Sequence, residues 1–272
     1  PTLILIHGTA SSTANAYGGF FNENIEIWRE IHEHYEGRVY GFEHRTLTKS
    51  PLENALEFLQ SIPPQANIHL ATHSRGGLVG DLLAHGLLSR AVFDDEDLER
   101  ELGKAYGKKS SSYRRQLAQY RQFNQRIVEM APNVSRYVRV GCPAAGTTLA
   151  SSRLDVYLSI SIHLLRQIPG IGPLLGGLGE FAAAVAKERT DPETIPGLEA
   201  QMPTSPLVRL LNGSRHELDT DLTVLAGDSD GFIKNLANLF YWRANDLVVD
   251  TRSMYGGAPR IRRLWHLEEN RP

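Results

Sequence analysis

Cysteine is nearly absent from this sequence, which contains a single one, Cys142, among 272 residues. One cysteine excludes an internal disulfide and fits a reducing compartment, so we expect a cytoplasmic protein. The chain also lacks an initiator methionine and a signal-like segment, because it opens on Pro1 and enters a short apolar run at once. We therefore expect a processed protein or a piece of a longer one.

Long apolar runs and an excess of one charge are missing as well. No stretch of roughly 18 uninterrupted apolar residues occurs, which argues against a transmembrane segment. The 29 Lys and Arg residues nearly balance the 31 Asp and Glu residues, for a formal net charge of -2, so nothing indicates a nucleic-acid partner. Hydrophobic residues make up 41% of the chain, which is ordinary for one large globular domain, expected to span residues 1–272.

Residues 68–88 contain the most informative pattern of the chain. Their first four residues predict a buried strand, and apolar residues at helical spacing over 78–87 predict a helix. The sequence HSRGG stands between them at 73–77. A serine, here Ser74, that is held between a strand end and a helix start and is followed by glycines is typical of a nucleophile elbow. Thr72 stands where the G-x-S-x-G pattern has its first glycine.

Strand and helix patterns alternate along the rest of the chain. Residues 2–6 and 38–42 have the composition of short strands, residues 24–35 have an amphipathic helical pattern, and a helix is expected to begin after Ser50 and to end before Pro63. Such strand–helix–strand units predict an α/β fold with a mostly parallel sheet flanked by helices. Later strands are expected at 137–141, 222–226 and 260–265.

Two segments depart from this alternation. Residues 91–134 are highly charged but keep a helical stripe, and we expect an exposed helical insertion there. Residues 150–212 include an apolar part that is rich in glycine and proline, and we expect a cap or lid over the site. An ordinary pair of core helices is the alternative for this second segment.

A serine nucleophile requires a base, and the base requires an orienting acid. In α/β-hydrolases the three follow the order Ser, Asp or Glu, His, which favours His266, near the end of the chain, over His216. Spacing alone leaves the acid open between Asp246 and the pair of aspartates at 228 and 230, of which Asp228 is the main alternative. Each of these aspartates could also be a simple turn residue.

The oxyanion that forms during acyl transfer needs two backbone N–H donors. One is expected from Arg75, which follows the nucleophile directly, and the other from Thr9, in the loop after the first strand. His7 and His73 are expected to pack against this loop and the elbow rather than to act as bases.

At this point the chain resembles a known family, the lipase and esterase branch of the α/β-hydrolases and especially bacterial triacylglycerol lipases. Five pieces match in order: LILIHG at 3–8, THSRGG at 72–77, VRVGCP at 138–143 with Gly146 and Thr147, NDLVV at 245–249, and WHLE at 265–268. The resemblance implies the α/β-hydrolase fold and favours Asp246 as the catalytic acid. Some of these lipases bind a structural calcium through aspartates near the histidine. Glu268 stands where one such aspartate would be and no second ligand is evident, so we expect neither a metal nor a cofactor.

These patterns predict a serine hydrolase that cleaves carboxylic esters through an acyl-enzyme. The apolar cap suggests a lipidic or otherwise apolar acyl group, with contact to a lipid interface through the cap. An acyltransferase or a thioesterase would use the same triad. A catalytically silent binding module of a larger protein is the alternative from another class.

Overall fold

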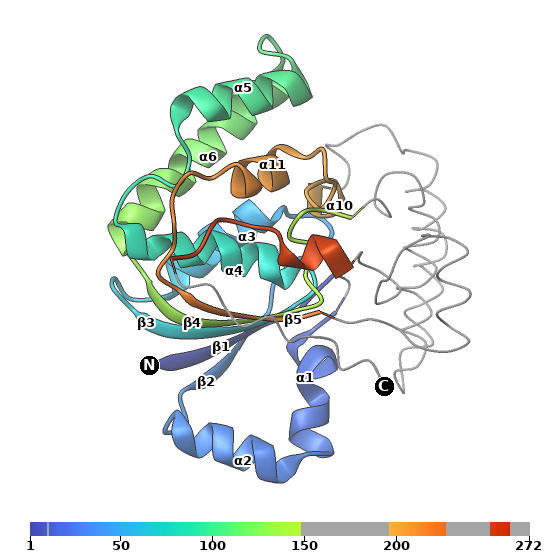
Figure 1. The fold of residues 1–272 in the computed structure, drawn as a ribbon, viewed down its shortest axis with the longest axis vertical. Coiled ribbons are helices and arrows are strands. Elements are labelled where there is room, and N and C mark those ends of the chain that lie inside the picture. The colour runs from blue at the N-terminus through green and yellow to red at the C-terminus, as the bar shows by residue number, and fades with distance from the viewer. Residues whose placement is uncertain (10, 148–195, 227–250, 262–272) are drawn as a thin grey trace, which may run out of the picture.

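The computed structural model describes residues 1–9, 11–147, 196–226 and 251–261 (Figure 1). Within them, five strands form one sheet in the order β2-β1-β3-β4-β5, and every neighbouring pair is parallel. The strands are β1 (Thr2–Ile6), β2 (Val39–Phe42), β3 (Asn67–His73), β4 (Asn133–Val140) and β5 (Asp221–Leu225). The predicted α/β class with a parallel sheet flanked by helices is confirmed.

The chain reverses its direction of travel across the sheet between β1 and β3. It goes from β1 outward to β2, returns to the other side of β1 as β3, and then continues to β4 and β5. The carboxyl ends of β1 and β3 are adjacent, because Ile6 pairs with Thr72. In open parallel sheets this reversal leaves a crevice outside the carboxyl ends of the two strands, where ligands bind.

Helices cover both faces of the sheet (Figure 1). On one face lie α1 (Thr13–Asn22) and α2 (Ile25–His34), which pack on Leu3 and Leu5 of β1. The opposite face of the same strand presents Ile4 and Ile6 to the larger core, as the two-residue period of a strand requires. That second layer comprises α3 (Pro51–Ser61), α4 (Gly76–Ala84) with the 3-10 turn η1 (His85–Leu88), α6 (Ser111–Met130) and α11 (Pro206–Asn212).

Helix α3 begins where the sequence predicts it, because Ser50 and Glu53 form a capping box of two reciprocal hydrogen bonds at its first turn. The Ser50 side chain accepts a hydrogen bond from the Glu53 N–H, and the Glu53 carboxylate accepts one from the Ser50 N–H. Pro51 occupies the first helical position, where a missing N–H costs nothing. The apolar side of the helix then enters the core through Leu52 and Leu59.

Helix α4 is buried along its whole length, and its glycines let it approach the sheet closely. A Cβ on Gly76 would lie 2.7 Å from the Ile6 carbonyl oxygen, and one on Gly80 would lie 2.6 Å from the Tyr137 hydroxyl. Any side chain at either position would therefore push the helix away from β1 and β4. Ser74 lies two residues before the helix begins, so the close packing of the helix also fixes the position of the serine.

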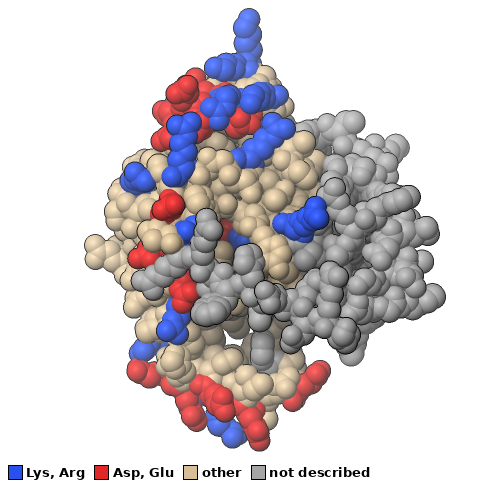
Figure 2. Space-filling model, in the orientation of Figure 1, with Lys and Arg blue, Asp and Glu red and all other residues tan. Residues whose placement is uncertain are grey.

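The charged segment before β4 contains two helices, α5 (Asp95–Tyr106) and α6. The stripe of α6 that includes Leu117, Phe123 and Ile127 is buried in the main core, where the helix packs against α3 and η1, so the expectation of an exposed insertion is wrong for this face of α6. Its outer side and α5 carry charged side chains of both signs, which gather at one end of the molecule (Figure 2).

The remaining elements of the described chain are short: α10 (Pro196–Glu199) and the 3-10 helix η2 (Thr251–Tyr255). Of the strand predicted over 260–265, the described part is a single parallel bridge between Arg260 and Leu218. The apolar stretch 150–195 of the predicted cap lies outside the described residues. No described helix is long and apolar enough to cross a membrane.

Candidate active site

Ser74 occupies the turn that joins β3 to α4, and its backbone is left-handed, with φ of +53°. Residues other than glycine rarely adopt this backbone conformation, because it costs them about 1–2 kcal/mol. Two backbone hydrogen bonds maintain it here: the Ser74 N–H donates to the Val140 carbonyl at 2.8 Å, and the Gly77 N–H donates to the Ser74 carbonyl at 2.9 Å. The turn has the sharp strand-to-helix geometry that the predicted nucleophile elbow requires.

The loop after β1 lies directly against this turn. A Cβ on Gly8 would lie 2.7 Å from Ser74 Cβ and 3.1 Å from the His73 carbonyl oxygen. Only glycine leaves enough room for the two segments to meet. The contact brings Thr9, the residue after Gly8, to the same edge of the sheet as the serine.

A buried glutamine, Gln201, fixes the position of Thr9. Its Nε2 donates to Thr9 Oγ1 at 3.2 Å and to the Gly197 carbonyl at 3.0 Å. The backbone carbonyl of Gln201 accepts a hydrogen bond from the Thr147 N–H at 2.8 Å. Gln201 thereby joins the loop after β1, the loop after β4 and α10. Gln201 could not be predicted from the sequence, because a single glutamine in a segment expected to form a cap carries no distinguishing pattern.

Arg75 follows Ser74, and its side chain is fully buried. The guanidinium donates to Asn54 Oδ1 at 2.9 Å, to the Gly197 carbonyl at 3.2 Å and to the Lys49 carbonyl. These bonds tie the first residue after Ser74 to α3 and α10. The side chain of Arg75 is therefore an anchor of the turn, a role that its predicted backbone function did not reveal.

His7 shapes the loop beneath Thr9 and is almost completely buried. Its Nε2 accepts the His44 N–H at 3.3 Å, which leaves Nδ1 as the protonated nitrogen that donates to the Gly8 carbonyl at 3.0 Å. Burial lowers the pKa of His7, in agreement with a neutral ring. The imidazole of His44 stacks on it with ring centroids 4.1 Å apart, and burial with the neighbouring His7 lowers the pKa of His44 to about 3.

Cys142, the one cysteine, and His216, the alternative base, are both unsuited to the predicted reaction. Cys142 is buried beneath Gly77, and burial raises the pKa of its thiol, so the reactive thiolate is disfavoured. His216 bonds to Arg90 Nη2 through Nδ1 at 2.7 Å, beyond the end of η1 and before β5 begins. That position is at the amino ends of the strands, opposite the edge that carries Ser74.

Asp246, His266 and the alternative acid Asp228 lie outside the described residues. Described segments flank the two aspartates, since β5 ends at Leu225 and the chain is described again over 251–261, and His266 follows this second segment by five residues. Ser253 in this second segment lies beside the loop after β4, because its carbonyl accepts the Ala145 N–H at 2.9 Å. The chain that leaves Asp246 therefore reaches the edge of the sheet where Ser74 stands.

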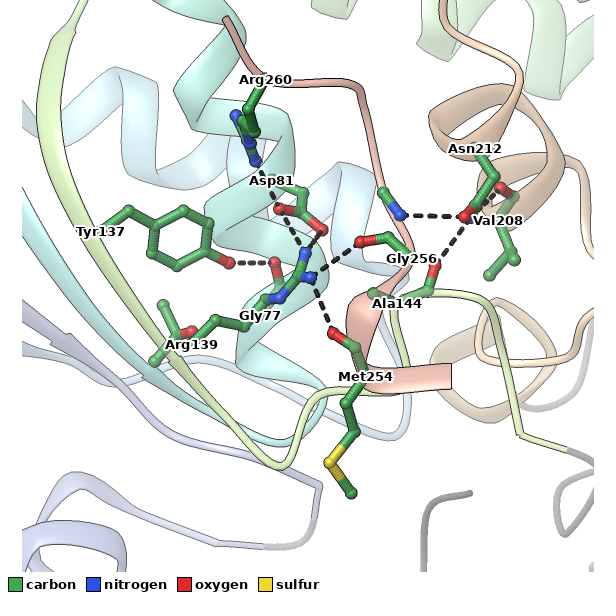
Figure 3. Close-up of polar contacts among 12 residues, drawn as sticks. Gly77, Asp81, Tyr137, Arg139, Ala144, Val208, Asn212, Met254, Gly256 and Arg260 are labelled. Atoms are coloured by element: carbon green, nitrogen blue, oxygen red, sulfur yellow. Dashed lines mark hydrogen bonds and ion pairs between the residues drawn. The ribbon is translucent and has the colours of Figure 1, made fainter. Parts of the chain in front are cut away.

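A buried ion cluster attaches this last segment to the elbow helix (Figure 3). Asp81 of α4 accepts hydrogen bonds from Arg139 Nη1 at 3.0 and 2.7 Å and from Arg260 Nη2 at 3.2 Å. Arg139 Nη2 also donates to the carbonyls of Met254 and Gly256, at 2.8 and 2.7 Å. One carboxylate thus connects α4, β4 and the chain between the predicted acid and the predicted base.

The charges of the cluster are strongly coupled. Burial opposes ionisation of Arg139, but the adjacent Asp81 carboxylate raises the pKa of Arg139 above its usual range. Burial lowers the pKa of Arg260, and Asp81 only partly offsets this effect. Asp81 therefore serves two buried guanidinium groups, and neither arginine has another carboxylate partner among the described residues.

A family model described as "Domain of unknown function (DUF7379)" matches residues 1–94 and 112–267. The chain belongs to this family. The DUF7379 match includes the elbow, the loop after β1, Gln201 and the Asp81 cluster. It leaves out residues 95–111, which comprise α5, the loop after it and the first residue of α6.

No curated protein matches the sequence. Among solved structures, phospholipase PlaB from Legionella pneumophila is similar with a TM-score of 0.41 and 14% sequence identity, over 84% of this chain. The similarity covers 39% of that phospholipase, so this DUF7379 chain corresponds to about two fifths of its length.

Proposed function

We propose that this chain is a serine hydrolase that cleaves carboxylic esters, with Ser74 as the nucleophile. The positive φ of Ser74 at the turn between β3 and α4 is the observation that carries the proposal. A strained residue persists when its surroundings enforce it, and such residues cluster at functional sites. The serine also stands beside the point where strand order reverses, at the carboxyl edge where open parallel sheets bind ligands.

In the proposed reaction Ser74 Oγ attacks the ester carbonyl while His266 takes its proton. Asp246 orients the imidazole and stabilises its protonated form. The tetrahedral intermediate collapses, His266 gives the proton to the leaving alcohol, and an acyl-enzyme remains. Water, deprotonated by His266, then attacks the acyl-enzyme, and His266 returns that proton to Ser74 Oγ as the carbonyl carbon–Oγ bond breaks, which releases the carboxylic acid and free Ser74.

The oxyanion of the tetrahedral intermediate is assigned to the backbone N–H groups of Arg75 and Thr9. Two features support this assignment. The Arg75 side chain bonds to α3 and α10, which holds the residue after the nucleophile rigid, and Gln201 holds Thr9 by its hydroxyl. Preorganised donors stabilise a developing charge without reorganising during the reaction.

The proposal extends to the substrate through the composition of residues 154–186, which are apolar and rich in glycine and proline. The predicted apolar cap favours an ester with an apolar or lipidic acyl chain. Hydrolysis of p-nitrophenyl acetate and p-nitrophenyl octanoate at equal efficiency would contradict this part of the proposal and leave the serine chemistry intact.

The decisive experiment combines labelling by a fluorophosphonate probe with p-nitrophenyl butyrate hydrolysis. The unchanged chain should label and turn over. Ser74→Ala should abolish both, while His266→Ala should lower turnover by about 10⁶-fold and Asp246→Asn by about 10⁴-fold. Ser89→Ala is the matched control, because Ser89 is an exposed serine with φ of +49° outside the site.

The outcomes separate the alternatives. Damage from Asp228→Asn in place of Asp246→Asn would move the acid and leave the reaction unchanged. Labelling without ester turnover would favour an acyltransferase or a thioesterase with the same triad. A chain that neither labels nor turns over would refute the hydrolase proposal in favour of a silent binding module.

A further inference from the structure

The side chain of Thr9 brings a hydroxyl to the carboxyl edge of the sheet, beside the turn that holds Ser74. Thr9 follows Gly8 directly, and a Cβ on Gly8 would lie 2.7 Å from Ser74 Cβ. Thr9 is only partly buried, in contrast to the glutamine behind it. Its backbone N–H is already assigned to the oxyanion, so the hydroxyl is a second donor carried by the same residue.

The amide of Gln201 meets this hydroxyl with its nitrogen. Nε2 has two hydrogens, of which one is donated to the Gly197 carbonyl at 3.0 Å and the other to Thr9 Oγ1 at 3.2 Å. The reverse orientation of the amide would place Gln201 Oε1 against the Gly197 carbonyl oxygen, and both are acceptors. The orientation of the amide is therefore determined, and Thr9 Oγ1 is the acceptor of this hydrogen bond.

A hydroxyl that accepts a hydrogen bond keeps its own proton for another one. Gln201 Oε1, at the other end of the same amide, lies 3.5 Å from Thr9 Oγ1, which is long beside the usual O–H···O distance of about 2.7 Å. No closer acceptor for this proton occurs in the part of the chain that the structure describes. The proton of Thr9 is therefore available to a better acceptor that enters the site.

The hydrogen bond from Gln201 also prepares the hydroxyl for donation. Consecutive hydrogen bonds polarise one another, so a hydroxyl that accepts from an amide N–H is a stronger donor. Gln201 is buried, and Arg75 Nε holds the Gly197 carbonyl at 3.2 Å from the other side. The amide is thus fixed before any substrate arrives, as a preorganised donor requires.

We propose that the Thr9 hydroxyl donates a third hydrogen bond to the oxyanion, beside the backbone N–H groups of Thr9 and Arg75, and that Gln201 is its positioning residue. This inference rests on the proposed hydrolase function. The hydroxyl gives a hydrogen bond and transfers no proton, so it acts alike when the acyl-enzyme forms and when water cleaves it. An ester carbonyl is a weaker acceptor than the oxyanion, so the hydroxyl contributes mainly to kcat and little to KM.

Hydrolysis of p-nitrophenyl butyrate by Thr9→Val and Thr9→Ser tests this inference. Valine has nearly the shape of threonine but lacks the hydroxyl, so kcat should fall by about 10²-fold with KM nearly unchanged. Serine keeps the hydroxyl and should retain most of the turnover. A trifluoromethyl ketone, whose carbonyl carbon bonds to Ser74 Oγ to give a tetrahedral oxyanion, should lose affinity by a similar factor in Thr9→Val and little in Thr9→Ser.

Gln201→Leu separates donation by the hydroxyl from simple support of the loop after β1. This change leaves the Thr9 hydroxyl in place without its hydrogen bond from the amide, so kcat should fall less than in Thr9→Val. Equal losses of kcat in the two variants would overturn the inference, because the hydroxyl would then serve only to attach Thr9 to Gln201.

Thr223→Val is the matched control, because Thr223 lies exposed on β5 and should change neither kcat nor KM. Circular dichroism of each variant establishes that it is folded. Full turnover by Thr9→Val, in a chain that Ser74→Ala inactivates, would overturn this inference and leave the proposed function intact. An unchanged chain that neither labels with fluorophosphonate nor turns over would overturn both.

Discussion

Gly8 and Ser74 approach so closely that a Cβ on the glycine would lie 2.7 Å from the Cβ of the serine. We therefore expect Gly8→Ala to separate the loop after β1 from the elbow. Overpacking of this kind costs about 1–3 kcal/mol, and it displaces Thr9 from the serine. Chemical unfolding should register the loss of stability, and fluorophosphonate labelling of Ser74 should fall more than the folded fraction does.

Gly19→Ala is the matched control for this change. Gly19 lies exposed in helix α1, and a Cβ there would meet nothing within 4 Å. Alanine in an exposed helical position stabilises by about 0.5–1 kcal/mol relative to glycine. Equal effects of the two substitutions would show that the Gly8 contact is unimportant.

The left-handed backbone of Ser74 predicts that stability and function oppose each other at this residue. Ser74→Gly should remove the strain of positive φ and raise the free energy of unfolding by about 0.5–1 kcal/mol, after the entropic cost of glycine is subtracted. Probe labelling should disappear. Ser74→Ala should lose labelling without the gain in stability, because alanine has the same Cβ.

Ser89→Gly separates the two effects, since Ser89 also has a positive φ but lies exposed at the end of η1. It should stabilise the protein and leave labelling unchanged. If Ser74→Gly destabilises while Ser89→Gly stabilises, the elbow serine is not strained and the main support for its role is lost.

The Asp81 cluster should be the most sensitive electrostatic site of the described chain. Asp81→Asn leaves Arg139 and Arg260 buried without their carboxylate, and removing one partner of a buried ion pair costs about 3–5 kcal/mol. The urea midpoint should fall accordingly. Asp95→Asn is the control, since Asp95 pairs with Arg121 in solvent and should change the midpoint little. Similar shifts from both changes would contradict the coupling described for the cluster.

The local features could be predicted from the sequence, but the contacts that join distant segments mostly could not. The capping box at Ser50 and the strand–Ser–Gly–Gly turn each lie within a few residues, so their chemistry is legible before folding. Asp81, by contrast, lies 58 residues from Arg139 and 179 from Arg260. A single aspartate in an otherwise apolar helix indicates that a positively charged partner exists, but it does not show which residue the partner is.

The candidate site divides in the same way. Ser74, Thr9 and Arg75 come from the two motifs at the ends of β1 and β3, and parallel pairing brings such strand ends together. Gln201 was not predicted, because its role depends on α10 folding back onto the loop after β1. The roles of Asp246 and His266 stay predictions, based on chain order and on resemblance to lipases.

Histidine burial predicts a loss of stability in mild acid. His85 is fully buried, and burial, assisted by the nearby charges of Arg260 and His216, lowers its pKa to about 4 against the effect of the hydrogen bond from its Nδ1 to the Asp81 carbonyl. The unfolded chain binds a proton at His85 below about pH 6.5, whereas the folded chain does so only near pH 4. Between these values the unfolded state holds more protons, so the free energy of unfolding falls as the pH falls, by about 3 kcal/mol from this residue.

Urea unfolding of the unchanged chain and of His85→Gln, at several pH values from about 7.5 to 4.5, measures this contribution. Glutamine retains an N–H donor for the Asp81 carbonyl but takes up no proton, so the variant should lose less stability over this range. His34→Gln removes an exposed histidine instead and should leave the pH dependence close to that of the unchanged chain. A His85→Gln profile parallel to that of the unchanged chain would mean that His85 is protonated equally in both states. The acid sensitivity would then come from other buried groups, such as His44, whose pKa is lowered to about 3.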